Sequence, residues 1–227
     1  MKLNKKKVFV SALAACLIAT ISMGTLAWFS DSDSVTNNFY VADSEDDTPE
    51  EIFSIDVWEN TPDGDKDQDG YEYDNILPGD TLKKEVRVEN TGHYEQYVRV
   101  IVTISDAQAW VNALGTEFNV TDVFDGFDAT KWTHIWNNMN DATTVPENIV
   151  YVLYYKDIVN SGDVINVFNN VKIPTSLTQA QAVAFGGSFS IDVKAQAVQT
   201  ENVVPEGTAV ADAAWAAFNT VGMTIGE

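Results

Sequence analysis

The sequence is poor in the residues that most often carry catalysis. It has one cysteine and two histidines in 227 residues. A single cysteine excludes an intramolecular disulfide, and His93 and His134 are 41 positions apart. No HExxH pair and no GxSxG sequence occurs, so the sequence indicates neither a zincin-type metal site nor a hydrolase nucleophile elbow. We therefore expect a protein that is not an enzyme.

Basic residues are also scarce. The chain has 13 Lys and Arg against 34 Asp and Glu, a formal charge of −21. Four of the lysines lie in the first seven residues, and no acidic residue precedes Asp31, so the remainder carries nine basic residues and a charge of −25. Such a surface repels nucleic-acid phosphates and anionic lipid headgroups. This excludes nucleic acid as a partner and leaves cations, sugars and other proteins.

The N-terminal residues 1–27 have the pattern of a secretory signal peptide. Lysines are followed by the apolar residues 8–23 and by small residues before Ala27, so we predict cleavage between Ala27 and Trp28. The 16-residue apolar run is shorter than the roughly 20 residues that span a bilayer. We therefore predict secretion without stable membrane insertion after cleavage. Residues 28–51 then form an N-terminal arm with an acidic linker, and residues 52–227 form the folded domain.

Cys16 leaves a second interpretation of the leader open. Residues 13–16, Leu-Ala-Ala-Cys, fit a lipobox, which would make Cys16 an acylated N-terminus. Hydrophobic residues 17–21 follow, where a lipoprotein normally turns polar, so the sequence favours Cys16 as an apolar filler. With cleavage at Ala27, the mature chain has no thiol for a disulfide, a nucleophile or a metal ligand.

The mature chain consists mostly of short β-prone segments separated by Gly, Pro, Asn and Asp. This pattern predicts an all-β antiparallel sandwich with one or two short helices. A weak internal echo, Gly79-Asp80 and Gly162-Asp163 each leading into a strand, indicates two similar hairpins and not a true repeat. The expected strands are 52–58, 82–88, 94–104, 149–155, 164–173 and 185–198, with 118–124 and 131–136 as strands or irregular segments; the expected helices are 107–114 and 208–219.

An acidic loop after the first of these strands resembles part of a calcium loop. Its alternating aspartates and Gly70 match positions 1, 3, 5 and 6 of an EF-hand, but Ile76 replaces the glutamate at position 12. We predict a Ca²⁺ site in a β-loop, completed by Glu72 or Asp74; a solvated acidic loop is the alternative. The candidate ligands are Asp65, Asp67, Asp69, Glu72 and Asp74.

Aromatic residues gather in two segments near the middle of the chain. They are able to form a sugar-stacking platform, but their β spacing favours places in the core. The residues are Trp132, Trp136, Tyr151, Tyr154 and Tyr155. His93 follows a turn and is expected to be exposed, and His134 lies in a strand flanked by tryptophans.

Four segments together resemble a known family. They are residues 24–31 (GTLAWFSD), 37–39 (NNF), 77–81 (LPGDT) and 89–92 (ENTG). This combination is similar to the TasA/camelysin family of exported biofilm matrix proteins, whose leaders are cut by a SipW-type signal peptidase. The C-terminal half, with Tyr154-Tyr155, residues 171–174 (VKIP) and residues 195–199 (AQAVQ), looks closer to the clostridial-type branch.

The resemblance implies a jelly-roll-like sandwich, secreted to the extracellular matrix or cell surface of a Gram-positive bacterium. It implies self-association into fibres, in which an N-terminal segment adds as a strand to the next subunit; an accessory matrix or anchoring protein is a further expected partner. That 35–41 is the first strand of its own sandwich remains the alternative. The residues expected to carry assembly are Trp28, Phe29, Val35, Phe39 and Val41.

Two other functions remain open. One is a monomeric secreted protein- or carbohydrate-binding module. The other is the metal-dependent protease activity described for camelysins, which the lack of a recognisable zinc constellation does not support.

Overall fold

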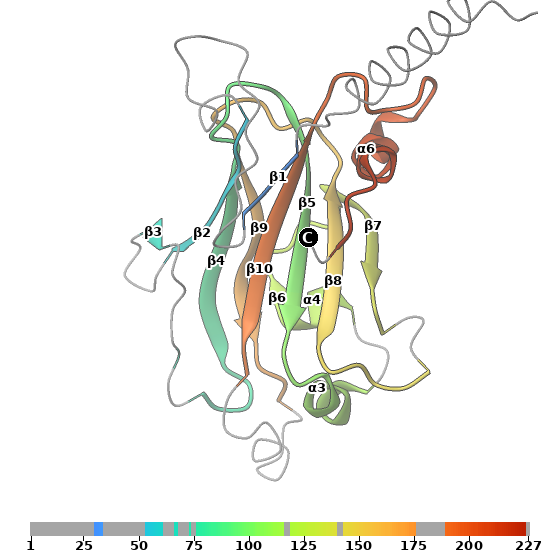
Figure 1. Cartoon of the computed structure of the whole chain (residues 1–227). Helices are drawn as coiled ribbons and strands as arrows, with labels where there is room; N and C mark the ends of the chain where they lie inside the picture. The colour runs from blue at the N-terminus through green and yellow to red at the C-terminus, as the bar shows by residue number, and fades with distance from the viewer. Residues whose placement is uncertain are drawn as a thin grey trace, which may run out of the picture.

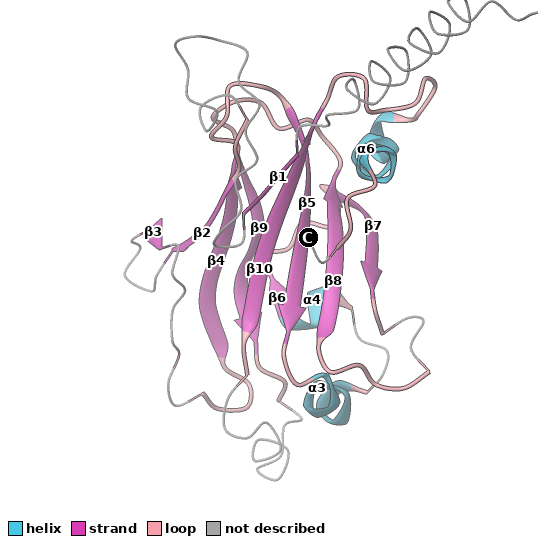
Figure 2. Cartoon of the chain, viewed as in Figure 1, coloured by secondary structure: helices cyan, strands magenta, loops and turns pink. Residues whose placement is uncertain are grey.

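The computed structural model describes residues 30–33, 53–60, 66–67, 73, 76–115, 119–139, 143–175 and 189–225. In these ranges the strands form two antiparallel five-stranded sheets packed face to face (Figures 1 and 2). Sheet A has the order β1 (Ser30–Asp33), β10 (Ile191–Gln199), β5 (Gln96–Ile104), β8 (Ile149–Tyr155) and β7 (Trp132–Asn137). Sheet B has the order β3 (Lys66–Asp67), β2 (Asp56–Asn60), β4 (Thr81–Glu89), β9 (Val164–Lys172) and β6 (Phe124–Asp125).

The strand pairing is nested along the chain. The pair β5 and β8 lies in sheet A, the surrounding pair β4 and β9 lies in sheet B, and the outer pair β1 and β10 returns to sheet A. Antiparallel pairs that are nested and alternate between two sheets give the jelly-roll-like arrangement. The predicted all-β sandwich is therefore confirmed.

Two hydrophobic clusters lie on opposite faces of sheet A. The larger fills the space between the sheets, with Val100 of β5 and Phe168 of β9 among its members. The smaller covers the outer face of sheet A, where Ile101 and Tyr154 pack against Phe218 of helix α6 (Ala213–Val221). The inner and outer faces of β5 are both buried, which explains why it is an almost continuous apolar run.

The sandwich has two ends that differ in structure. One end, here called the Asn90 end, consists of Phe53–Ser54 and the loops 90–95 and 156–163. Asn90 is fully buried and joins both loops, because its Nδ2 donates to the carbonyl oxygens of Tyr94 (2.8 Å) and Val159 (2.9 Å). Its Oδ1 accepts from the Gly92 amide at 3.0 Å, so the side chain's donors and acceptor are all used in holding this end together.

The opposite end, here called the Leu77 end, carries the turn 77–80 and helix α3 (Ala107–Leu114), at the bottom of Figure 1. Asp80 Oδ2 accepts from the Leu77 amide at 2.7 Å, and the Asp80 amide donates to the Leu77 carbonyl at 3.1 Å. Gly79 has φ 92°, which a residue with a Cβ rarely adopts, and its amide donates to the Ile173 carbonyl at 3.1 Å. This turn is therefore fixed to the end of β9.

The two similar Gly-Asp sequences, at 79–80 and 162–163, form two turns of the same construction. Asp163 Oδ2 accepts from the Asn160 amide at 3.0 Å, and Gly162 has φ 78°, as at Asp80 and Gly79. The strands that follow, β4 and β9, pair with each other. Each aspartate closes its turn by accepting a hydrogen bond from a main-chain N–H group, which is the usual role of Asp in such turns.

Four predicted segments need correction. The strand expected over 52–58 is β2, which spans Asp56–Asn60. Residues 120–123 form helix α4 (Val120–Val123) because the Asn119 amide donates to Asp122 Oδ2 at 2.6 Å, and only Phe124–Asp125 is a strand. Strand β10 begins at Ile191, since the Ser190 amide donates to the Ser105 hydroxyl instead of a strand carbonyl. The C-terminal helix is divided into η1 (Val210–Asp212) and α6, after a turn closed by Thr208 and Pro205.

Candidate assembly edge

The edge of sheet A is completed by a segment close to the N-terminus. Residues 30–33 form β1, which pairs antiparallel with β10 in the register Ser30 to Val198 and Asp33 to Ala195. The sequence Ser-Asp-Ser-Asp has low β-propensity, so the pairing depends chiefly on main-chain hydrogen bonds. Without β1, this side of β10 presents unpaired N–H and C=O groups along an open edge.

The part of β10 that β1 covers is the buried part. Ala195, Gln196, Ala197 and Val198, the four residues opposite β1, are each fully buried. The earlier residues of β10, Ile191–Lys194, are half-buried or exposed. We call Ala195–Val198 the acceptor edge, since it is the stretch on which a strand adds.

The acceptor edge is fixed to the rest of the sheet by Arg99 of β5. The guanidinium Nε donates to Gln196 Oε1 at 2.6 Å, and Nη2 donates to the carbonyl oxygens of Met223 (3.0 Å) and Thr224 (2.8 Å). Its central carbon lies 4.4 Å from the centroid of the Phe218 ring. Arg99, only 2% exposed, thus joins the acceptor edge, the central strand and the segment after α6.

The point where the domain resumes after the arm is also fixed. The Ser54 carbonyl accepts from the Gly92 amide (3.2 Å) and from Gln96 Nε2 (2.9 Å), and its hydroxyl bonds the Thr91 hydroxyl at 2.7 Å. Ser54 therefore belongs rigidly to the Asn90 end. Nineteen residues, 34–52, lie between β1 and Phe53, the residue before Ser54.

The predicted assembly residues fall beside, not within, the described segment. Trp28, Phe29, Val35, Phe39 and Val41 lie outside the described residues, as does the predicted cleavage site between Ala27 and Trp28. Sequence reasoning selected 35–41 for its β-propensity and missed 30–33, which has none. It also missed the acceptor edge. In the sequence, this stretch is distinguished by the alternation of small and larger residues over 195–198.

The predicted calcium ligands are almost all outside the described residues too. Only Asp67 falls within them, as part of β3, whose backbone pairs with Glu59 and Asn60 of β2. In the part of the chain that the structure describes, no three His, Cys, Asp or Glu side chains gather closely enough to hold a metal ion. The calcium site stays a prediction.

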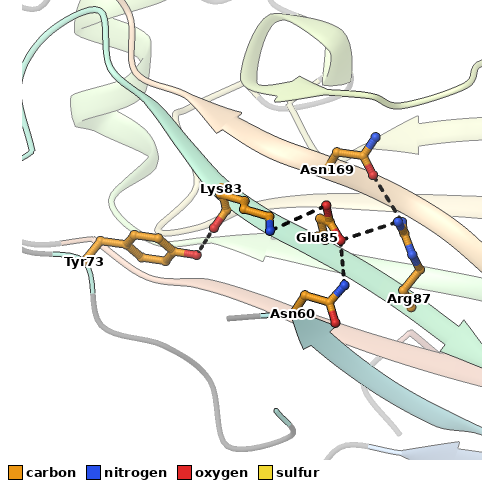
Figure 3. A network of polar contacts seen from close by, with 6 residues as sticks. All are labelled: Asn60, Tyr73, Lys83, Glu85, Arg87 and Asn169. Atoms are coloured by element: carbon orange, nitrogen blue, oxygen red, sulfur yellow. Dashed lines mark hydrogen bonds and ion pairs between the residues drawn. The ribbon is translucent and has the colours of Figure 1, made fainter. Parts of the chain in front are cut away.

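Both flanks of that acidic loop are held on sheet B (Figure 3). Asn60, before the loop, donates from Nδ2 to Glu85 Oε2 at 2.6 Å, and Tyr73, near its end, donates from its hydroxyl to the Lys83 carbonyl. Glu85 also forms ion pairs with Lys83 (4.0 Å) and Arg87 (3.7 Å). Arg87 donates onward to Asn169 Oδ1 of β9 at 3.1 Å. Asn60 and Tyr73 therefore both contact this polar network on sheet B.

No family model matches this chain, and neither a curated protein nor a solved structure matches it. The resemblance to the TasA/camelysin family consequently stays an expectation. Among the described residues, no helix has both the length and the apolar composition needed to cross a membrane.

The aromatic residues considered as a sugar platform belong to the core. Trp132, Tyr151 and Tyr154 are at most 7% exposed, and Trp136 and Tyr155 are half-buried. They also lie on two faces: Tyr151 contacts the cluster between the sheets, and Tyr154 contacts the one beneath α6. The core interpretation of these residues is therefore supported, and they do not form one exposed surface.

The two histidines have different surroundings. His93 is exposed in the 90–95 loop, as expected. His134 lies at an irregularity of β7 with φ 45°, stacks on Trp215 at 4.7 Å between ring centroids, and its Nε2 is 2.8 Å from Asp212 Oδ1. His134 thus fastens the edge strand β7 to η1 and α6, a structural role that the sequence did not indicate.

Proposed function

We propose that this protein is a secreted structural subunit of extracellular biofilm matrix fibres. In this proposal the N-terminal arm of one copy adds to the acceptor edge of the next. The observation that carries it is the pairing of β1 with β10, since a four-residue strand completes the sheet edge and is separated from its own domain by 19 residues. A strand added in this way is held by main-chain hydrogen bonds that another copy of the same segment makes equally well.

The arm and the acceptor edge are separate surfaces, so strand exchange is able to continue from copy to copy. The arm and the acceptor edge are different surfaces of one chain, so a contact between them is heterologous. A heterologous contact that does not close into a ring propagates as a filament. A fully extended stretch of 19 residues spans at most about 65–70 Å, against about 30 Å for a nine-residue strand. The arm is therefore long enough for both self-pairing and exchange.

The experiment is electron microscopy of the secreted chain, concentrated in millimolar Ca²⁺ after expression with its leader in a Gram-positive host. We expect filaments from the wild type. In the variant Ser32→Pro/Asp33→Pro, at least one amide that faces β10 is removed, so filaments should be lost while the circular dichroism spectrum is kept. A proline pair at Asp46 and Asp47, in the linker, is the matched control and should still polymerise.

Each outcome bears on a different part of the proposal. Filaments that persist in the Ser32→Pro/Asp33→Pro variant would show that strand addition at β10 does not drive assembly. Compact monomers from the wild type would contradict the structural role itself and favour a monomeric binding module.

A further inference from the structure

Strand β7 is the longest outer strand of either sheet in the described ranges. It has six residues, against four in β1 and two each in β3 and β6, and it lies at the end of sheet A beside α6 (Figure 1). The free side of an edge strand presents N–H and C=O groups to which a strand of another molecule is able to add. The sequence of β7, Trp-Thr-His-Ile-Trp-Asn, is rich in residues that favour such pairing.

A bulge interrupts this edge. Two residues, His134 and Ile135, lie opposite the single residue Leu153 of β8. His134 has φ 45°, a left-handed conformation that is usually left to glycine at this position of a bulge. A bulge bends an edge strand and increases its twist, so that its outward N–H and C=O groups no longer form a regular ladder.

Packing does not require the extra residue in β7. Trp132 belongs to the cluster between the sheets, and Trp136 packs against the cluster on the outer face of sheet A. In a regular strand, residues four apart face the same side and residues three apart face opposite sides. Without His134 the two tryptophans would be three apart, and both would keep their faces in a strand that pairs regularly with β8. Ile135, which is 39% exposed, would then lie opposite the buried Leu153.

The bulge is held in place by contacts with the helical segment beside it. The His134 imidazole stacks on the Trp215 indole at 4.7 Å between ring centroids, and its Nε2 lies 2.8 Å from Asp212 Oδ1. These contacts offset the cost of the left-handed backbone. A left-handed histidine and an exposed isoleucine are both unfavourable for stability, so the fold gives up stability in order to keep β7 irregular.

We propose that β7 is a second strand-pairing edge, which the His134 bulge keeps closed. The partner that the bulge excludes is β7 of a second copy, because two copies of one edge strand are able to pair antiparallel about a twofold axis. The bulge thus leaves the acceptor edge on β10 as the edge of sheet A at which a strand adds. The inference does not require fibres, since it concerns the association of two folded copies.

Deletion of His134 from the secreted chain tests the proposal. The deletion variant should melt at or above the wild-type temperature and form dimers, so that light scattering in EDTA gives about twice the wild-type mass at equal concentration. His134→Gly is the matched control, because glycine accepts the left-handed conformation and keeps the bulge. It should have the wild-type mass, although it loses the contacts with Trp215 and Asp212.

A proline distinguishes strand pairing from misfolding. The Lys156 amide donates to the Lys131 carbonyl at 3.0 Å, and the Asn138 amide donates to the Val150 carbonyl at 3.1 Å. Because the bonds of an antiparallel ladder alternate from these positions, the Ile135 amide of the deletion variant faces away from β8. Adding Ile135→Pro therefore removes a donor from the open edge and none from the ladder with β8, and should restore the wild-type mass.

Every other result contradicts the proposal. A deletion variant that keeps the wild-type mass would show that the bulge closes nothing, and one that fails to fold would show that packing requires His134. A His134→Gly variant that dimerises would show that the imidazole and not the bulge prevents association. Dimers that persist with Ile135→Pro would show that the copies do not associate through β7.

Discussion

At the scale of single residues, Arg99 has the most consequences for the fold. A buried guanidinium in the middle of β5 is tolerated because the Gln196 side chain and two carbonyl oxygens after α6 accept hydrogen bonds from it. Its planar shape also lets it lie over the Phe218 ring. A lysine at this position would carry the same positive charge, but it lacks the several N–H donors that the planar guanidinium holds in a fixed arrangement.

We expect Arg99→Lys to lower the free energy of unfolding by about 2–4 kcal/mol, because several charge-assisted hydrogen bonds are lost in a buried site. Amide hydrogen exchange over 213–221 should accelerate more than elsewhere, since α6 loses its anchor. Arg87→Lys is the matched control: the Arg87 side chain is 23% exposed in the network of Figure 3, and its replacement should cost less than that of Arg99, about 1 kcal/mol. Urea denaturation of both variants measures the difference, and equal costs would contradict this role of Arg99.

Buried tyrosines make the fold sensitive to alkaline pH. Burial raises the pKa of Tyr151 well above its usual value of 10.0, with a smaller contribution from Asp122, and burial also raises the pKa values of Tyr97 and Tyr155. A group whose pKa is higher in the folded state contributes stability that is fully present below its unfolded pKa. That stability is lost as the pH rises from about 10 toward the folded pKa.

We therefore expect the melting temperature to fall steeply above about pH 10 and Tyr151→Phe to make that fall shallower, with little change at pH 7. Circular dichroism melts between pH 7 and pH 11.5 measure this. Tyr94→Phe is the control, because the Tyr94 ring is 62% exposed to water. A Tyr151→Phe variant that follows the wild-type curve throughout would exclude this tyrosine as a cause.

At the scale of elements, the sequence predicted most accurately those segments whose local residue pattern matches the secondary structure that they adopt in the fold. The helix Ala107–Leu114 and the strand Ile149–Tyr155 have the predicted bounds, since one has an apolar helical face and the other is dense in β-branched and aromatic residues. Residues 120–123 were not predicted as a helix because four residues with two valines give no helical period. Ser30–Asp33 has no strand pattern at all, since a partner edge and not side-chain propensity makes it a strand.

The turn 90–92 shows how an element is determined by contacts distant in sequence. From the sequence, Asn90-Thr91-Gly92 is only a turn, but in the structure Asn90 joins β4, the 90–95 loop and the 156–163 loop. Replacing Asn90 by alanine removes three hydrogen bonds inside the Asn90 end, to the Tyr94 and Val159 carbonyls and from the Gly92 amide, although the Val159 carbonyl and the Gly92 amide each keep one main-chain partner. We expect Asn90→Ala to cost about 2–4 kcal/mol in urea denaturation.

Thr91→Ala is the matched control for Asn90→Ala. The Thr91 hydroxyl makes an exposed hydrogen bond to Ser54, and its loss should cost less than about 1 kcal/mol. If Asn90→Ala unfolded at the same urea concentration as Thr91→Ala, the buried amide would not be what holds the Asn90 end together.

At the scale of the whole molecule, charge opposes association. Without its leader the chain carries nine basic and 34 acidic residues, so copies repel one another before any strand is exchanged. Salt reduces this repulsion, because the screening length falls from about 30 Å at 0.01 M to about 10 Å at 0.1 M. A bound Ca²⁺ reduces it further by removing charge at one place.

The two effects of cations are separable by comparing CaCl₂ and NaCl at equal ionic strength, about 5 mM against about 15 mM. We expect Ca²⁺ to lower the critical concentration for filaments more than Na⁺ does, and EDTA to remove the difference. The variant Asp65→Asn/Asp67→Asn/Asp69→Asn should respond equally to both salts. The control Glu147→Gln/Glu201→Gln/Glu206→Gln removes the same charge from exposed positions elsewhere and should keep the preference for Ca²⁺. If both variants lose that preference, Ca²⁺ acts through total charge and the predicted calcium site is wrong. If EDTA leaves wild-type assembly unchanged, assembly does not depend on Ca²⁺ at all.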